Sequence, residues 1–419
     1  MHLSAILKMI DNRKQELFDL LARLIQINSE NFGSHGNEQA CAEYVRDLCL
    51  ELGLETEMYS PLELKGFTEH PDYFPGRNLE NRFNVTAKWK GTEDSNKLML
   101  MGHLDTVMIG DPGNWDMDPL SGAIKDGCIW GRGSCDDKYA LATSLFLIRL
   151  LKEIGFQPKQ NLLFNAYCDE ELGGSHGALA AVLKDRCEIT VNMDGRIHQI
   201  WNCASGGQVV TYRYKMRGTC DSAEKAAKLL PVVMEELSTF GKHRREELAC
   251  NPYYAGTNIP ATAMRYIEIR AGNNDMDKHI GLLQFTFYTD KTKEVIWEEL
   301  AQLDKYLQEK LDVLDADSLG FEGNTRFFHY GACMQNDPEI QSMVEAIKEA
   351  GLTEPLVCGS CLSDMSVILK YGGKHVVNFG SGQGFDKPGG AHQPNERINC
   401  DVLLDYTKAI ASYILRTLG

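Results

Sequence analysis

The chain has 419 residues, of which 43% are hydrophobic, and this length suits two or three domains better than a single core. Its 43 basic and 59 acidic residues give a formal net charge of −16. This charge argues against a nucleic-acid partner or an anionic membrane surface, since both select for a basic face. No uninterrupted apolar stretch reaches the length of a membrane span, so no membrane association is expected.

The cysteines and the N-terminus indicate the compartment. The thirteen cysteines are scattered without regular spacing, so they do not outline a disulfide framework. The first residues, Met1 to Ala5, lack the charged region and the long apolar run of a signal peptide. We therefore expect a cytoplasmic protein with reduced, structural cysteines.

The first half of the chain alternates between predicted helices and predicted strands. Apolar residues at helical spacing indicate the helices, and short apolar runs between turn residues indicate the strands. In chain order these are helices up to residue 27 and at 38–53, strands at 54–59, 84–90 and 97–101, a helix at 139–154, a strand at 161–168, a helix at 175–183 and a strand at 188–193. The strand–helix–strand succession after residue 97 is the unit of a parallel α/β sheet.

The pattern changes at about residue 206 and changes back at about residue 318. The intervening part has alternating strands at 209–216, 262–269 and 282–288 and helices at 223–237 and 294–314, and Pro231 should kink or split the first of these helices. The later part has helices at 339–350, 364–371 and 401–418, a strand at 375–379 and a glycine-rich loop at 380–390. The sequence therefore predicts a mostly parallel-sheet α/β domain with helices on both faces, formed by residues 1–205 and 318–419. It also predicts an inserted α+β domain at 206–317.

A histidine and a carboxylate stand where the strand at 97–101 should end. His103 and Asp105 are two residues apart, so along a strand their side chains point the same way. A carboxylate beside an imidazole fixes its tautomer and raises its basicity as a metal ligand. Taken alone, however, the pair is better explained as a solvated strand end.

Further chemistry-bearing side chains fall at equivalent places. At or beyond the end of a predicted strand lie His103, Glu170, Glu171, Asp194 and His392, and Asp136 lies in a loop that enters a helix. In open α/β sheets the site lies at those carboxyl ends. Carboxylates that gather there repel each other, and a bound cation removes that penalty. Mixed nitrogen and oxygen ligands suit zinc, manganese or cobalt better than magnesium or calcium.

The number of ligands fits two metal ions. A carboxylate can bridge two ions about 3.5–4 Å apart and leave each open to water and substrate. A base must also take the proton from the attacking water. The adjacent pair Glu170-Glu171 can supply it, since one carboxylate can bind metal while the other faces the water.

These motifs resemble the dinuclear zinc peptidase family that includes acetylornithine deacetylase, succinyl-diaminopimelate desuccinylase, aminoacylase, glutamate carboxypeptidase and the carnosinase-like dipeptidases. The matching segments are Gly102–Val107, Trp115–Pro119, Gly131–Lys138, Asp169–Glu171, Asp194-Gly195 and Gly390–Glu396. The match runs from the first helix nearly to the C-terminus, and the segments occur in the family's order.

The resemblance implies a role for each residue. It makes His103 and Asp194 ligands of one zinc, Glu171 and His392 ligands of the other, and Asp136 the bridging carboxylate. It makes Glu170 the general base and Asp105 the partner of His103, and it implies a cis peptide bond between Asp136 and Asp137. It also implies that the inserted segment is a lid domain, which in many members forms a homodimer.

The departures from the family fall in this inserted segment. Many members carry Arg-Gly followed four residues later by a histidine that reaches the substrate, whereas here Arg217-Gly218 is followed by Ser222. The usual arginine near the end of the last lid strand is also missing from residues 287–290. Two histidines, His279 and His329, are candidate substitutes. Three arginines could meet a substrate carboxylate, and nothing in the sequence favours one of them: Arg265, Arg270 and Arg326.

The leading hypothesis is a metal-dependent amide hydrolase that acts on a small N-acyl amino acid or a dipeptide, with Glu170 moving the proton. The alternative, motivated by the departures in the lid, is a catalytically silent metal-binding relative that serves as a ligand or partner module. A third hypothesis keeps the enzyme but gives it a mononuclear site, in which Glu171 and His392 do not share an ion.

Overall fold

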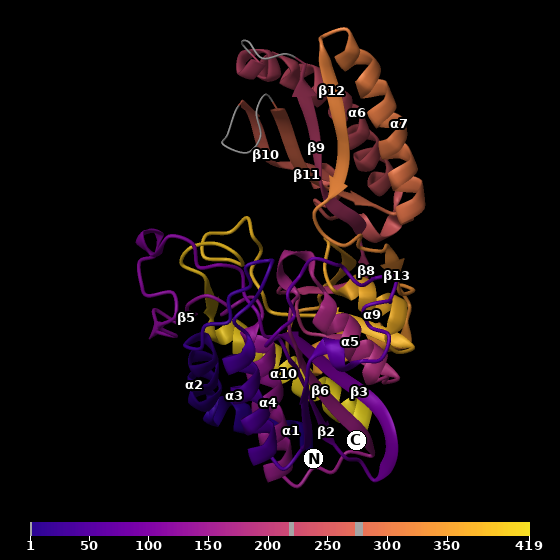
Figure 1. Ribbon diagram of the computed structural model, residues 1–419. Helices are drawn as coiled ribbons and strands as arrows, with labels where there is room; N and C mark the ends of the chain where they lie inside the picture. The colour runs from indigo at the N-terminus through magenta and orange to yellow at the C-terminus, as the bar shows by residue number, and fades with distance from the viewer. Residues whose placement is uncertain (1, 218–221, 273–279) are drawn as a thin grey trace. The chain divides into compact units, whose positions relative to one another are not determined.

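The computed structural model describes residues 2–217, 222–272 and 280–419 (Figure 1). It divides into two compact units. The first unit comprises Met1–Asn202, Cys333–Val357 and Val367–Gly419, and the second comprises Cys203–Ala332 and Cys358–Ser366. The second unit extends beyond the predicted end of the insertion at residue 317, because strand β12 (Ala316–Gly323) pairs with β9 (Gly206–Met216).

A mixed sheet with a parallel centre lies mainly in the first unit. Among the described residues it has nine strands in the order β1-β2-β6-β3-β7-β15-β8-β13, with β14 also paired to β8. These strands are β1 (Glu55–Tyr59), β2 (Asn84–Trp89), β3 (Glu93–His103), β6 (Gln160–Tyr167), β7 (Ile189–Asn192), β8 (Gln199–Ala204), β13 (Gly331–Ala332), β14 (Leu356–Ser360) and β15 (His375–Phe379). The central strands β6, β3, β7 and β15 are parallel to one another, so their carboxyl ends meet at one edge.

Helices cover both faces of this sheet, as the sequence predicted (Figure 1). They are α1 (His2–Asn12), α2 (Lys14–Ile25), α3 (Gln39–Glu51), α4 (Lys138–Glu153), α5 (His176–Lys184), α8 (Pro338–Glu349), α9 (Met365–Tyr371) and α10 (Cys400–Leu418). Side chains of β3 alternate between the two cores. Leu98 and Leu100 pack with α1–α4, α8 and α10, whereas Met99 and Met101 pack with α5 and α9. Burial on both faces explains why this strand is a continuous apolar run.

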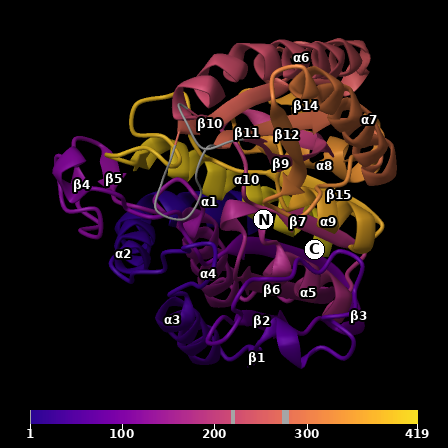
Figure 2. The ribbon, with the colours of Figure 1, turned by 45° about the horizontal axis from the view of Figure 1, so that its top comes forward.

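A small sheet supports the loops beside the central strands. It has the order β16-β5-β4, with β4 (Ile124–Lys125), β5 (Cys128–Trp130) and β16 (Arg397–Asn399), and Figure 2 shows β4 and β5 next to α2. Because β16 follows the segment Gly390–Glu396, its pairing with β5 brings that segment close to the loop that begins at Gly131.

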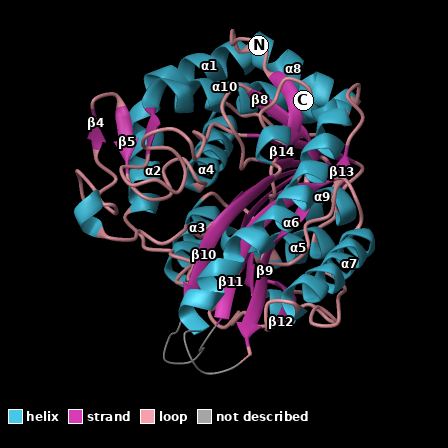
Figure 3. Cartoon of the chain, turned by 90° about the horizontal axis from the view of Figure 1, so that it is seen from above, coloured by secondary structure: helices cyan, strands magenta, loops and turns pink. Residues whose placement is uncertain are grey.

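The second unit is an α+β layer. Its antiparallel sheet has the order β10-β11-β9-β12, with β10 (Met264–Gly272) and β11 (Ile280–Thr289), and Figure 3 shows β10, β11 and β9 side by side. Helices α6 (Ser222–Cys250) and α7 (Lys293–Asp312) share one core with this sheet. Pro231 does not split α6, which continues to Cys250. No helix of the described residues is long and apolar enough to cross a membrane.

Candidate metal centre

The predicted ligands are placed by the carboxyl ends of the parallel strands. His103 is the last residue of β3, Glu171 follows β6, Asp194 follows β7, and His392 lies between β15 and β16. Asp136 comes just before α4. This is the edge of an open α/β sheet at which ligands usually bind.

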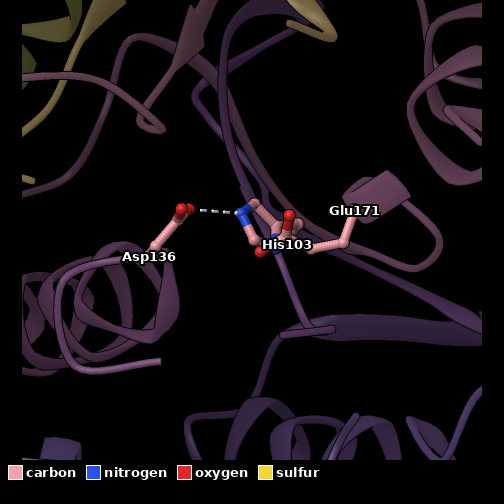
Figure 4. Close-up of side chains that lie close together, drawn as sticks. All are labelled: His103, Asp136 and Glu171. Atoms are coloured by element: carbon pink, nitrogen blue, oxygen red, sulfur yellow. Dashed lines mark hydrogen bonds and ion pairs between the residues drawn. The ribbon is translucent and has the colours of Figure 1, made fainter. Parts of the chain in front are cut away.

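The structure brings four of these residues into direct contact. One ligand atom each of His103, Asp136 and Glu171 lies within 4.8 Å of the others (Figure 4). The Nε2 atom of His103 is 3.1 Å from Oδ1 of Asp136, and that of His392 is 3.2 Å from Oδ2 of the same carboxylate. Nε2 of His392 is also 3.0 Å from Oε2 of Glu171. Asp136 therefore presents one oxygen to each histidine.

The electrostatics of this group fit a divalent cation. Although burial opposes it, the carboxylates of Asp105 and Asp136, and more weakly that of Glu170, raise the pKa of His103 well above its ordinary value. Likewise Glu171 and Asp136 raise the pKa of His392 against the effect of burial. The carboxylates therefore favour positive charge at this place. Imidazole nitrogens and carboxylate oxygens are also the donors that zinc, cobalt and manganese bind.

Asp194 lies beside these residues but is not one of the three whose ligand atoms lie within 4.8 Å of one another, which are His103, Asp136 and Glu171. Burial first, and then the carboxylates of Asp194 and Asp136, raise the pKa of Asp137, which places Asp194 near that buried side chain. The Tyr139 hydroxyl donates to the Met193 carbonyl at 2.6 Å and accepts from the Gly195 amide at 3.3 Å. The backbone on both sides of Asp194 is therefore fixed.

Asp105 supports the site differently from the expected carboxylate–histidine contact. Nδ1 of His103 lies 2.9 Å from the backbone carbonyl of Asp105, and the carboxylate is farther away, at 3.6 Å. That carboxylate instead accepts the backbone N–H groups of Glu170 (3.0 Å) and Glu171 (2.9 Å) and the side-chain amide of Asn31 (2.8 Å). The reason is that β3 ends at His103, so strand alternation no longer sets the direction of Asp105.

A buried charge network, which the sequence did not reveal, lies next to Glu170. Asp169 has a positive φ of 58° and is fully buried. Its Oδ1 atom is 2.7 Å from Arg82 and 2.8 Å from Arg77, and its Oδ2 atom contacts Nδ1 of His176. These contacts hold the end of β6 in the conformation that presents the two glutamates.

A second buried ion pair joins the loops of Asp136 and His392. The Arg132 guanidinium pairs with Glu396, and both side chains are buried. The other oxygen of Glu396 accepts the N–H of Cys135 at 3.0 Å. Glu396 belonged to a matching segment, but its partner was not predictable. The Asp136-Asp137 peptide bond is cis, as expected.

The described residues that were considered for substrate binding belong to the second unit and have partners there. Arg326 donates to the Ser366 hydroxyl at 2.8 Å and lies 3.6 Å from Asp364, whereas Arg270 lies 3.6 Å from Glu268. Arg265 reaches the Tyr288 hydroxyl at 3.4 Å. His329 packs edge-on against Phe327, and His279 lies outside the described residues.

Comparison with known proteins decides the family. Residues 99–416 match the model of the peptidase family M20/M25/M40. The chain belongs to this family. It is therefore a metal-dependent hydrolase, and the resemblance inferred from the motifs is confirmed.

Individual proteins are similar to the chain over almost its full length. An uncharacterized metallohydrolase of Methanocaldococcus jannaschii is 24% identical, over 93% of this chain and 96% of its own. The N-formyl-4-amino-5-aminomethyl-2-methylpyrimidine deformylase of Bacillus subtilis is 22% identical, over 97% and 96%. The crystal structure of human carnosine dipeptidase 1 superimposes with a TM-score of 0.71 at 16% identity, covering 99% of both chains, and so shows the same fold.

Proposed function

We propose that this M20 hydrolase is a zinc-dependent amide hydrolase that removes an N-acyl group from an amino acid or cleaves a small peptide. The observation that carries the proposal is the position of Asp136, which offers one carboxylate oxygen to each of two histidines. Such a carboxylate is suited to bridge two ions. Cobalt or manganese would fit the same ligands. The names of the relatives, a deformylase and a dipeptidase, also refer to the cleavage of amide bonds.

The ligands divide into two sets around Asp136. His103 and Asp194 would hold one ion, and Glu171 and His392 the other. Ions held by these residues would polarise a substrate carbonyl and lower the pKa of the attacking water. The contact of Glu171 with His392 supports its assignment as a ligand rather than as the base.

Glu170 is the residue proposed to move the proton. It is half-buried, its backbone N–H is bound by Asp105, and its charge helps raise the pKa of His103, so its carboxylate lies near the site. The Glu170 carboxylate takes a proton from the attacking water and later donates it to the nitrogen of the leaving amine.

The test replaces Glu170 and keeps the ligands. Glu170→Ala and Glu170→Gln should bind metal as the wild type does, measured by elemental analysis, and should lose at least about 100-fold in kcat on a panel of N-acyl amino acids and dipeptides. Glu69→Ala, an exposed glutamate of the same unit, is the control. Near-normal turnover by Glu170→Ala would show that another group is the base.

The same measurements distinguish the alternatives. The alternative is a catalytically silent relative that binds ligands or partners, and the engagement of Arg326 and Arg270 within the second unit supports it. Two bound metals without hydrolysis of any panel member would favour that function. About one metal per chain, unchanged by Glu171→Gln or His392→Ala, would favour a mononuclear enzyme.

A homodimer through the second unit is also proposed. Strand β10 is at the edge of its sheet and exposes Ile267 (56%) and Ile269 (44%) among charged residues, and the edge strand of a sheet can pair with another chain. Light scattering should give a dimer for the wild type and a monomer for the double variant Ile267→Lys/Ile269→Lys. A monomeric wild type would contradict the proposal.

A further inference from the structure

Most cationic side chains near the metal centre are already engaged within the protein. Arg77 and Arg82 pair with Asp169, and Arg132 pairs with Glu396. The buried Lys138 donates to two backbone carbonyls, at 3.0 and 2.7 Å. These cationic groups form ion pairs or hydrogen bonds with oxygen atoms of the protein itself, so they are not available to a substrate.

Arg196 is different. It follows Asp194 by two residues, and backbone hydrogen bonds fix its position. The N–H of Ile197 donates to the Gly382 carbonyl at 3.0 Å, and the N–H of Gly382 donates to the Gly195 carbonyl at 2.8 Å. Within the described part of the chain, no aspartate or glutamate comes within ion-pairing distance of the Arg196 guanidinium.

The guanidinium instead lies over an aromatic ring that reaches the metal centre. Its Cζ atom is 5.5 Å from the centroid of the Phe385 ring, and that ring is 4.7 Å from the His392 ring, at an interplanar angle of 39°. Gly384 leaves room for this arrangement, because a Cβ atom there would lie 2.7 Å from Oδ1 of Asp386 and 3.3 Å from Cζ of Arg196. Stacking on an aromatic face orients a guanidinium while leaving its N–H groups able to bind an anion.

We propose that Arg196 receives a carboxylate of the substrate and so selects amides that carry a free carboxylate. This inference rests on the proposed function. A guanidinium that is held in place but has no carboxylate partner is suited to bidentate recognition of a substrate carboxylate. Its position in the first unit, connected through Phe385 to His392, distinguishes it from Arg265, Arg270 and Arg326 of the second unit.

The experiment compares substrates that differ only in this charge. N-acetyl amino acids are paired with their carboxamides, and each pair is assayed with wild type, Arg196→Gln and Arg196→Lys. Arg196→Gln should lower kcat/KM for the acid roughly 10–100-fold, mainly through KM, and change it less than about twofold for the carboxamide. Arg196→Lys should recover part of the loss. Arg186→Gln, at an exposed arginine of the same unit, should change neither substrate.

Binding of non-hydrolysed acids provides a readout that does not depend on turnover. Dicarboxylates from malonate to adipate are titrated into the metal-loaded protein, with monocarboxylates of equal length as the reference. At least one dicarboxylate should bind roughly 10–100-fold more tightly than its monocarboxylate, and this advantage should disappear in Arg196→Gln. Equal metal content of the variants would exclude an indirect effect through Asp194.

The outcomes separate the two proposals. If the wild type hydrolyses no amide but Arg196→Gln abolishes the advantage of a dicarboxylate, the proposed function fails and the carboxylate site stands. If Arg196→Gln impairs acid and carboxamide equally, or impairs neither, Arg196 does not recognise the carboxylate, even in an active enzyme. If Arg196→Gln still binds a dicarboxylate more tightly than the monocarboxylate of equal length, Arg196 likewise does not recognise the carboxylate.

Discussion

Replacing Asp105 with asparagine tests how the Glu170–Glu171 segment is held. The carboxylate accepts three hydrogen bonds, from two backbone N–H groups and from Asn31, at 2.8 to 3.0 Å. Asparagine has the same size but can accept with only one oxygen, and its NH₂ group would face a donor. At least one buried donor would then lose its partner.

The magnitude follows from these contacts. An unpaired buried donor costs about 1–3 kcal/mol. If this penalty falls on the conformation that binds metal, the affinity of the metal drops about 10–100-fold, the range found when groups behind metal ligands are removed. Because Glu170 belongs to the same segment, kcat should fall as well.

Two assays check this. Competition with a chromophoric chelator measures metal affinity for the wild type, Asp105→Asn and the control Asp19→Asn, an exposed aspartate of α2. Turnover at saturating metal then separates poor metal binding from poor placement of Glu170. Unchanged affinity and unchanged kcat in Asp105→Asn would refute the reasoning and leave its carboxylate without a part in the site.

Three further predictions concern stability. Chelation should lower Tm, and zinc should restore it, because an ion that binds only the folded state adds about 2.7 kcal/mol at 100 times its Kd; equal melting curves with and without chelator would contradict a metal site. Glu396→Gln should lower the free energy of unfolding in urea by about 3–5 kcal/mol, because it leaves Arg132 charged and buried. Adding Arg132→Met should recover part of that loss. If it recovers none, the unpaired charge of Arg132 is not the cause of the destabilisation. Against the effect of burial, Arg82, His176 and Arg77 lower the pKa of Asp169, so its charge stabilises the fold above about pH 4, and this contribution disappears as the pH falls through the folded-state pKa. In urea unfolding between pH 3 and 6, the free energy of unfolding should therefore fall less on acidification for Asp169→Asn than for the wild type. An equal fall in both would show that the Asp169 carboxylate does not control acid stability.

The fold was predictable where local pattern and burial agree. The apolar run before His103 becomes a strand buried on both faces, and the predicted helix after Asp137 is α4. The end of the insertion was misplaced because the alternation of apolar and polar residues in β12 changes phase between Ala316 and Leu319. It has a register shift between Ser318 and Gly320, and Gly320 has a positive φ. Pairing with β9, and not local propensity, makes it a strand.

The placement of the candidate ligands at strand ends was predictable, because they sit in short motifs that follow apolar runs. The supporting groups were not, since their contacts join distant parts of the chain. Asn31 binds Asp105 across 74 positions and Asp169 across 138. Nothing in the sequence around Asn31 indicates either partner. The same holds for Arg196, whose relation to His392 depends on Phe385, from a different loop.

Two groups of carboxylates around the candidate metal centre differ in their partners, and this difference determines which of them can bind a cation. Carboxylates that support the loops from behind are paired with arginines, as Asp169 is with Arg82 and Glu396 with Arg132. Asp136 and Glu171 contact only histidines among the charged groups within ion-pairing distance in the described residues, so their negative charge remains available to cations. It follows that neutralising a carboxylate of the first kind should change metal affinity through geometry while leaving the number of bound ions unchanged. Neutralising one of the second kind should reduce that number.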